Sequence, residues 1–284
     1  MMKENISRTE VEILRLFPGA QTTVSHIAEV LEMDISWASR CVSNLVELGF
    51  LEREKKGREV FINVVDAPLG TALNNLLMEE PAMNLHALIG GTSLRILPLL
   101  LEPGFSAQDI VRRSNLTLKT VYARLKRWRG MGVAVKSGDA YVLNPRAPLV
   151  IEFAREYIRS RNLIHQREHN PDAAIVWQDR DDYIISTREV FSDGGFRTAG
   201  PPRLAEEGYD IAFRNYYYYH SPIRYEISEA EALVQTLKFD INNPRPLKYI
   251  QEAIKNRKVT KNELRKYAKK YGVEKRIEEA LQWS

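Results

Sequence analysis

Three sets of residues in this chain have types and spacings that could do chemistry. Asp179, Asp181 and Asp182 are carboxylates close enough to hold the magnesium ion of a phosphoryl-transfer enzyme. His165 and His169 are four residues apart, which could place two metal ligands on one helix face. The third set consists of lysines and arginines within residues 117–136, which could bind a polyanion. The segments around each set decide which chemistry is feasible.

The acidic and histidine sets lack the partners that catalysis or metal binding requires. Gly90-Gly91-Thr92-Ser93 resembles the Gly-Gly-Ser/Thr motif of nucleotidyltransferases, but its glycines open a segment that recurs elsewhere in the chain. The aspartates lie in a charged turn far from this motif. Asn170-Pro171 follows the histidines, and no third ligand is evident. We therefore expect no enzyme activity, no metal and no cofactor, and no nucleophile elbow or phosphate-cradling glycine loop is present to change that expectation.

Composition predicts a cytoplasmic protein with an uneven distribution of charge. A single cysteine, Cys41, excludes a disulfide framework, and no apolar run approaches the ~18 residues of a membrane span. Residues 1–65 hold 8 basic and 10 acidic residues, a net charge of −2. Residues 91–146 hold 10 and 3, a net of +7, and residues 251–284 hold 10 and 5, a net of +5. Such local excess of positive charge favours a polyanionic partner.

The cations of residues 117–136 belong to a unit that occurs twice, 83 residues apart. Val11–Phe17 returns as Leu94–Leu100, and Met33–Phe50 returns as Leu116–Val133. The unit is too long for a stacked array, whose repeats have periods of about 20–50 residues. It therefore indicates a duplicated small domain. Each copy is predicted to contain three helices, the third the longest, followed by a two-stranded hairpin.

The second copy has a signal at each boundary. We predict an apolar helix over Thr92–Leu101, a short helix capped by Ser106, and a third helix capped by Thr117. Gly132 ends the third helix, and a hairpin with its turn at residues 137–139 follows. Apolar residues of the third helix recur at three- to four-residue spacing and are assigned to the core: Leu118, Val121, Leu125 and Trp128.

The first copy has the same pattern. Thr23 is expected to cap a helix that extends to Glu32, and Asp34 caps the third helix, which Gly49 ends. A hairpin follows, with its turn near Lys56-Gly57. The residues of the third helix assigned to the core are Ile35, Ala38, Val42 and Leu45.

Three helices and a hairpin with these caps resemble the winged helix-turn-helix domain of MarR- and ArsR-like regulators. The most specific stretch is Leu116–Ala134, which is similar to the family's recognition helix and first wing strand. The resemblance implies a third helix that enters the major groove of double-stranded DNA and a wing that lies on the backbone or minor groove. It also implies regulation of transcription through sequence-specific DNA binding.

In the second copy, position along the third helix assigns the DNA contacts. Side chains near its N-terminus are best placed for base edges, and later ones meet phosphates. We predict that the base-edge set is Lys119, Thr120, Tyr122 and Arg124. The predicted phosphate-binding set is Lys126, Arg127 and the wing residue Lys136, which would add salt-dependent affinity. A merely solvated basic helix is the alternative.

The first copy presents a polar and nearly uncharged third helix, with cations in its wing. Serine and arginine can read base edges, but a net charge of −2 gives little basis for independent affinity. Trp37 could contact DNA or a partner, or pack on the second domain. DNA contact, dimerisation and inter-domain packing all remain open here. The residues that would contact DNA are Ser36, Ser39, Arg40, Lys55, Lys56 and Arg58.

The last third of the chain has a different pattern. Residues 191–202 are predicted to form a loop, and Tyr216–Tyr219 form a strand with tyrosines on both buried faces. Helices follow from Ser228 onward. Ser228 and Thr260 each begin a capping-box pattern of their own. Residues 227–237 and 266–281 resemble the C-terminal domain of type IV abortive-infection antitoxins and related archaeal regulators. That resemblance implies a domain that binds a protein partner or an effector.

These features predict an α+β, mostly helical regulator with two tandem winged-helix domains. The segments are a first winged helix over 1–66, a helical linker over 67–90, a second winged helix over 91–146, a connecting helix over 147–169 and a small α+β C-terminal domain over 170–284. Its long helices could form a homodimer, and no membrane is involved. The alternative is an antitoxin-like protein that neutralises a partner protein and autoregulates its operon. RNA binding by the C-terminal third is a further alternative.

Overall fold

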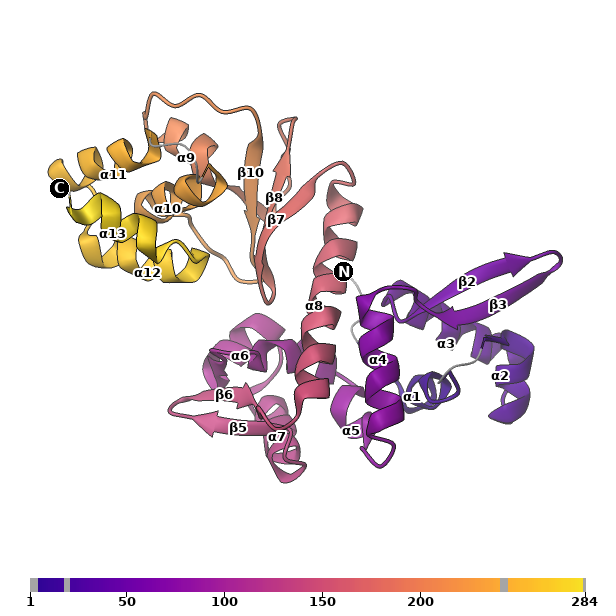
Figure 1. The fold of residues 1–284 in the computed structure, drawn as a ribbon. Coiled ribbons are helices and arrows are strands. Elements are labelled where there is room, and N and C mark those ends of the chain that lie inside the picture. Colours follow the sequence, from indigo (N-terminus) through magenta and orange to yellow (C-terminus); the bar gives the residue numbers. More distant parts are fainter. Residues whose placement is uncertain (1–4, 18–20, 241–244, 283–284) are drawn as a thin grey trace. The chain divides into compact units, whose positions relative to one another are not determined.

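The computed structural model describes residues 5–17, 21–240 and 245–282, and the chain divides into two compact units after Ile164 (Figure 1). The N-terminal unit contains two groups of helices with a small sheet each, which we call the first module (residues 5–64) and the second module (residues 93–143). The C-terminal unit contains one larger sheet and five helices within its described residues. Within those described ranges, every helix is too short or too polar to cross a lipid bilayer.

The first module follows the predicted order of elements. Asp34 and Thr23 cap their helices as expected, because each side chain accepts a hydrogen bond from a backbone N–H of the first turn. Its sheet has the order β1-β3-β2, with the hairpin turn at Gly57. The elements are α1 (Arg8–Leu14), β1 (Thr22–Thr23), α2 (Val24–Val30), α3 (Ile35–Glu47), β2 (Leu51–Lys56) and β3 (Glu59–Val64).

The segment predicted as one apolar helix over 92–101 is different in the structure. It forms two short 3-10 helices, η1 (Ser93–Arg95) and η2 (Leu97–Leu100), after α4 (Pro68–Glu79) and α5 (Leu85–Ile89). Pro98 lies in the first turn of η2, where a continuous α-helix would need the N–H that proline lacks. Four of the five leucines of this segment are nevertheless buried, and Leu101 is half-buried, so the prediction of an apolar core segment was right and the prediction of its backbone was wrong.

From β4 onward, the second module repeats the element order that the first module has from β1 onward. Its sheet order, β4-β6-β5, corresponds to β1-β3-β2. Leu118, where α7 begins, follows the start of α3 by 83 residues, and Phe105, where β4 begins, follows the start of β1 by the same interval. The elements are β4 (Phe105–Ser106), α6 (Ala107–Ser114), α7 (Leu118–Gly130), β5 (Ala134–Ser137) and β6 (Ala140–Leu143).

The core of the N-terminal unit contains the predicted stripes of α3 and α7, with one exception in each helix. Val121, Leu125 and Trp128 are buried, but Leu118 is 42% exposed and Ile35 is 53% exposed. Both exposed residues occupy the first position of their helix. They share the angular direction of the stripe but lie one turn before the packed region, so the prediction that they are core residues was wrong.

A long helix, α8 (Pro148–His169), completes the N-terminal unit and continues into the C-terminal one. Phe153 and Tyr157 of α8 stack on Phe50 of the first module, with ring centroids 6.1 and 5.8 Å from that of Phe50. Aromatic pairs at such distances add to the energy of their burial. This stack anchors α8 on the first module.

The C-terminal unit has a four-stranded sheet in the order β7-β8-β10-β9. The segment 191–202 was predicted to be a loop, but it contains β9, which pairs with the edge of β10. The four tyrosines of β10 alternate between two buried clusters, as predicted. The elements are β7 (Ala174–Asp179), β8 (Asp182–Thr187), β9 (Phe196–Thr198), α9 (Gly200–Glu206), β10 (Tyr216–His220), α10 (Glu229–Phe239), α11 (Arg245–Lys255), α12 (Lys261–Tyr271) and α13 (Glu274–Gln282).

Candidate nucleic-acid interface

The predicted base-edge residues in the N-terminal turn of α7 differ in their exposure to solvent. Lys119 is exposed, Tyr122 is 45% exposed, and Thr120 is half-buried. The Thr120 N–H donates to Thr117 Oγ1 at 3.2 Å, and the two hydroxyl oxygens are 2.9 Å apart. The Thr120 hydroxyl is therefore part of the helix cap, while the exposed residues Lys119 and Tyr122 lie on the same turn.

Arg124 lies in a different environment from the other cations of α7. It is half-buried, and a Cβ atom built on Gly91 would come within 2.6 Å of a guanidinium nitrogen. Gly91 has φ +62° and exchanges two backbone hydrogen bonds with Ile6. Burial, with a smaller contribution from Arg127, lowers the pKa of Arg124. The guanidinium packs against the backbone near Gly91, a position that its helical spacing did not reveal.

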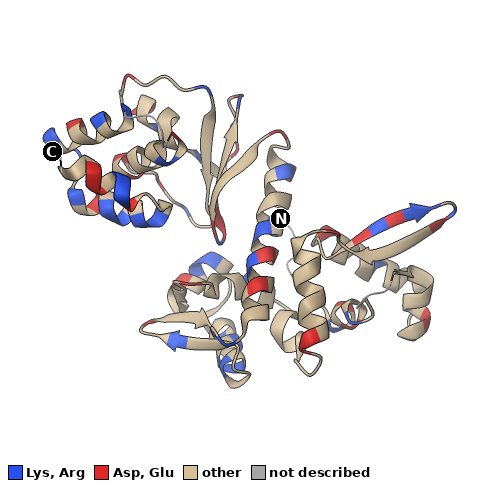
Figure 2. Ribbon diagram, viewed as in Figure 1, with Lys and Arg blue, Asp and Glu red and all other residues tan. Residues whose placement is uncertain are grey.

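Two of the three phosphate-binding residues predicted for the second module border a hollow of about 490 Å³ between the end of α7 and β5. Lys126 and Lys136 line it, together with Arg129, which the sequence analysis did not assign. Arg129 is exposed and lies three residues after Lys126, so the spacing along the helix could have revealed it. Figure 2 shows the basic residues of α7 and β5. Arg127 is exposed elsewhere on α7.

The corresponding surface of α3 has a single cation, Arg40, and an exposed aromatic ring. The Arg40 guanidinium carbon lies 5.0 Å from the ring centre of Trp37, which is 42% exposed. Ser36 is exposed and Ser39 is half-buried. Asp34 accepts hydrogen bonds from the hydroxyl and the N–H of Ser36, and these bonds hold the pKa of the Asp34 carboxyl below its ordinary value.

The wing of the first module alternates cations and anions. Lys55, Lys56 and Arg58 are exposed, as a DNA-binding wing requires. Lys56 Nζ lies 3.0 Å from a carboxylate oxygen of Glu54, and it donates to Gln21 Oε1 at 3.0 Å. Figure 2 shows blue and red segments mixed along β2. This wing therefore offers phosphates a weaker positive field than the hollow of the second module does.

The groups considered for catalysis or metal binding have structural partners. His165 Nδ1 lies 2.6 Å from the Tyr183 hydroxyl, and His169 Nδ1 lies 2.7 Å from Asp193 Oδ2. Asp179 forms an ion pair with Arg180 at 2.7 Å. Among residues 5–17, 21–240 and 245–282, no group of three or more histidine, cysteine, aspartate or glutamate side chains could hold a metal ion.

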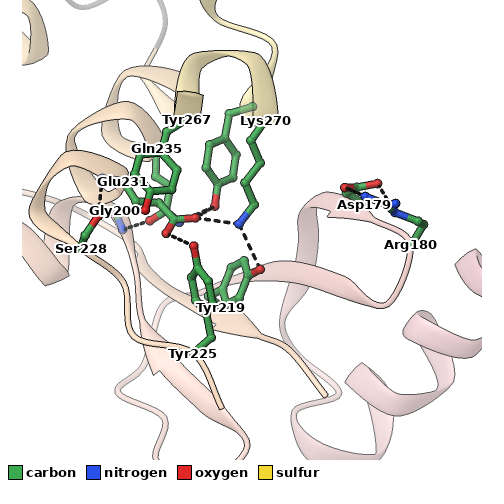
Figure 3. Close-up of polar contacts among 11 residues, drawn as sticks. Asp179, Arg180, Gly200, Tyr219, Tyr225, Ser228, Glu231, Gln235, Tyr267 and Lys270 are labelled. Carbon is green, nitrogen blue, oxygen red and sulfur yellow. Dashed lines mark hydrogen bonds and ion pairs between the residues drawn. The ribbon is translucent and has the colours of Figure 1, made fainter. Parts of the chain in front are cut away.

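A buried polar cluster in the C-terminal unit was missed by the sequence analysis. Glu231 is fully buried and accepts hydrogen bonds from Lys270 Nζ (2.8 Å) and from the hydroxyls of Tyr271 (2.6 Å) and Tyr225 (2.7 Å) (Figure 3). Lys270 Nζ also donates to the Tyr219 hydroxyl at 3.2 Å. Burial, and then the Glu231 charge, raises the pKa of Tyr225 and Tyr271, so both hydroxyls remain donors.

Comparison with known proteins identifies one segment. Residues 11–55 match the IclR helix-turn-helix domain, a range that runs from α1 through α3 into β2. No curated protein matches the chain. The first module therefore contains a helix-turn-helix DNA-binding segment of the kind found in transcriptional regulators.

Proposed function

We propose that this protein is a sequence-specific transcriptional regulator with two winged helix-turn-helix domains, the second of which supplies most of the affinity for DNA. The observation that carries the proposal is the repeated order of elements together with the surface of α7. The element order and sheet order of the first module, which contains the IclR-type segment, recur in the second module at an interval of 83 residues. The second copy adds the positive charge that a DNA duplex attracts.

The exposed side chains of α7 suit the two kinds of contact that such a helix makes. Lys119 can donate to guanine O6 and N7, and Tyr122 can contact base edges or sugars when the N-terminal turn lies in the major groove. Lys126, Arg129 and Lys136 surround a hollow in which a backbone phosphate would meet three cations. The first contacts would select sequence, and the second would fix position and affinity.

The first module is proposed to contribute selectivity with little charge. Ser36 and Arg40 are exposed on α3 and can hydrogen-bond base edges. The Lys55, Lys56 and Arg58 side chains of its wing would touch phosphates. The match to the IclR helix-turn-helix domain supports a DNA contact for this module more strongly than its charge does.

The C-terminal unit is proposed to bind a protein partner or an effector that modulates DNA binding. Its sheet and helices form a second compact unit with its own core, as a sensor domain requires. We propose no catalytic role for it. The buried cluster around Glu231 holds α10 and α12 to the end of the sheet and has the character of a structural network.

Genome-wide mapping of DNA bound by the intact protein tests the regulator function. We expect a small set of enriched sites that share a short sequence. Fluorescence anisotropy on one such duplex should give binding at least ~10³-fold tighter than on a shuffled duplex at the same salt concentration. Absence of enriched sites would overturn the proposal, and so would equal affinity for an enriched duplex and its shuffled counterpart.

A further inference from the structure

The C-terminal unit contains a cavity of about 240 Å³ at the edge of its sheet. It is lined by residues of the Gly194-Gly195 turn, by β9, by the end of β10 and by the segment Ser221–Tyr225 that follows β10. Tyr219 forms part of its wall and is itself only 1% exposed. Cavities for drug-sized ligands begin at ~300 Å³, so this one suits a smaller molecule.

Two arginines give the cavity its chemistry. Arg197 is the register partner of Tyr219 across β9 and β10, and side chains directly opposite each other project to the same face of a sheet. One of its terminal nitrogens donates to the carbonyl oxygens of Gly194 (2.8 Å) and Phe196 (2.9 Å), which holds the guanidinium in place. Arg224 also lines the cavity, and within the described part of the chain it has neither an ion pair nor a hydrogen bond.

The cavity wall also holds a polar atom that has no partner. Ser221 Oγ is inaccessible to solvent and makes no hydrogen bond within the described residues. A buried hydroxyl without a partner costs free energy, and in folded proteins such groups nearly always have one. Ser221 lines the cavity, so a rotation of its side chain would turn Oγ toward a ligand oxygen, which would supply the partner. The two guanidinium groups and the hydroxyl are all donors, and no carboxylate lines the cavity.

We propose that this cavity is a binding site for a small oxyanion, a phosphate or carboxylate group held by Arg197, Arg224 and Ser221. Guanidinium groups bind both classes through paired hydrogen bonds, because both present two oxygens in one plane. The site stands on the geometry of the C-terminal unit alone, and it does not depend on whether the chain binds DNA.

The cavity wall connects the site to the Glu231 cluster. Tyr219 and Tyr225 line the cavity with part of their surface, while their hydroxyls contact Lys270 and Glu231 respectively (Figure 3). Trp177 stacks on Tyr219 with ring centroids 6.2 Å apart. An anion that displaces Tyr219 or Tyr225 would therefore be felt by the Trp177 ring, which provides a spectroscopic signal next to the site.

Isothermal titration calorimetry of the full chain with inorganic phosphate, and separately with succinate, tests the proposal at ionic strength held constant with sodium chloride. We expect saturable binding of at least one of them at one site per chain, with a change in tryptophan fluorescence. Binding of phosphate alone would identify a phosphate site, and binding of succinate alone a carboxylate site.

Variants separate this site from general attraction to a basic protein. Arg197→Gln and Arg224→Gln should each weaken binding about tenfold, since each removes a charge-assisted hydrogen bond. Arg214→Gln is the matched control, because Arg214 is exposed in the same unit and does not line the cavity. Thermal unfolding confirms that the variants fold. No saturable binding of either anion, or the same affinity in the Arg197→Gln/Arg224→Gln double variant as in Arg214→Gln, would overturn the proposal.

Discussion

The helices α3 and α7 occupy equivalent places in two modules with the same order of elements, yet they present different surfaces. α7 carries five lysines and arginines over Leu118–Gly130, whereas α3 carries one over Ile35–Glu47. The match to the IclR helix-turn-helix domain nevertheless falls on the module of α3. The match to a DNA-binding family and the larger positive charge thus fall on different modules.

This difference separates the buried positions that maintain the fold from the outward positions that are free to vary. Ala38, Val42 and Leu45 in α3 correspond to Val121, Leu125 and Trp128 in α7, and all six are buried. The outward positions obey no such constraint. Under the proposed function, α3 would contact base edges with few charges, whereas α7 would add phosphate contacts and most of the affinity to its own base contacts.

The largest expected effect comes from the hollow of the second module. Replacement of Lys126, Arg129 and Lys136 together by alanine should weaken binding to every duplex by about 100-fold or more. The slope of log K against log salt should fall by about 3, since each phosphate contact contributes about 0.9. Fluorescence anisotropy over a series of salt concentrations measures both quantities.

The matched control for the triple variant lies in the C-terminal unit. Lys255, Lys269 and Lys275 are exposed lysines outside both modules, so their replacement by alanine removes the same charge from elsewhere. We expect the decrease in the salt slope to be at most half as large in this variant as in the Lys126/Arg129/Lys136 variant. Equal losses in the two variants would show that net charge, and not the hollow, governs DNA binding.

The second effect concerns the packed stripe. Leu125→Ala should destabilise the N-terminal unit by about 2–5 kcal/mol, because Leu125 is 1% exposed and its removal leaves a cavity. Leu118→Ala should change stability by less than about 0.5 kcal/mol, since its side chain is 42% exposed. Chemical denaturation monitored by circular dichroism measures both. A large loss of stability in Leu118→Ala would restore Leu118 to the core.

A third comparison asks whether selectivity is divided as proposed. Lys119→Ala in α7 and Arg40→Ala in α3 should each reduce the ratio of specific to nonspecific affinity by about tenfold, with each loss confined to a different half of the bound sequence. Binding to a library of singly substituted duplexes locates the affected base pairs. If Arg40→Ala leaves every position unchanged, the first module does not read sequence.

Replacement of the exposed apolar residues Ile35 and Leu118 should have a smaller effect on binding to the same duplex library. Both lie at the first position of a helix proposed to enter the major groove, where an aliphatic side chain can contact a thymine methyl group. Alanine at either position should reduce the preference for thymine at one base pair by a few-fold, on the order of 1 kcal/mol. Uracil in place of that thymine in the duplex should mimic the loss without any change to the protein.

Much of this comparison was predictable from sequence because the relevant signals are local. The caps Asp34 and Thr117 lie directly before the helices they begin, and the stripe of α7 follows a simple period. The exposure of Ile35 was not predictable, because periodicity gives the direction of a side chain and not the point at which the core ends. The surroundings of Arg124 depend on Gly91, which is distant in sequence and is held in place by its hydrogen bonds to Ile6.

The Glu231 cluster was even less predictable from sequence than the surroundings of Arg124. Its members come from β10, the segment after it, α10 and α12, so no spacing along the chain reveals them. A fully buried carboxylate is not expected from sequence, since acidic residues are usually exposed. It is stable here because a lysine and two tyrosine hydroxyls satisfy it, and those partners are known only after the chain folds.

The smallest expected effect is a difference between the two modules in their sensitivity to low pH. The cap of α3 is Asp34, whose folded-state pKa lies below its ordinary value of 3.8 because of its hydrogen bonds with Ser36, whereas the cap of α7 is Thr117, which does not titrate. The ionised Asp34 therefore stabilises α3 at neutral pH, and this stabilisation is lost as the pH falls through the folded-state pKa. NMR amide shifts of residues 35–38 should change between pH 5 and pH 2.5 before those of residues 118–121 change. Asp34→Asn keeps an acceptor that does not titrate and should abolish this difference, and its persistence in that variant would assign the acid sensitivity to another group.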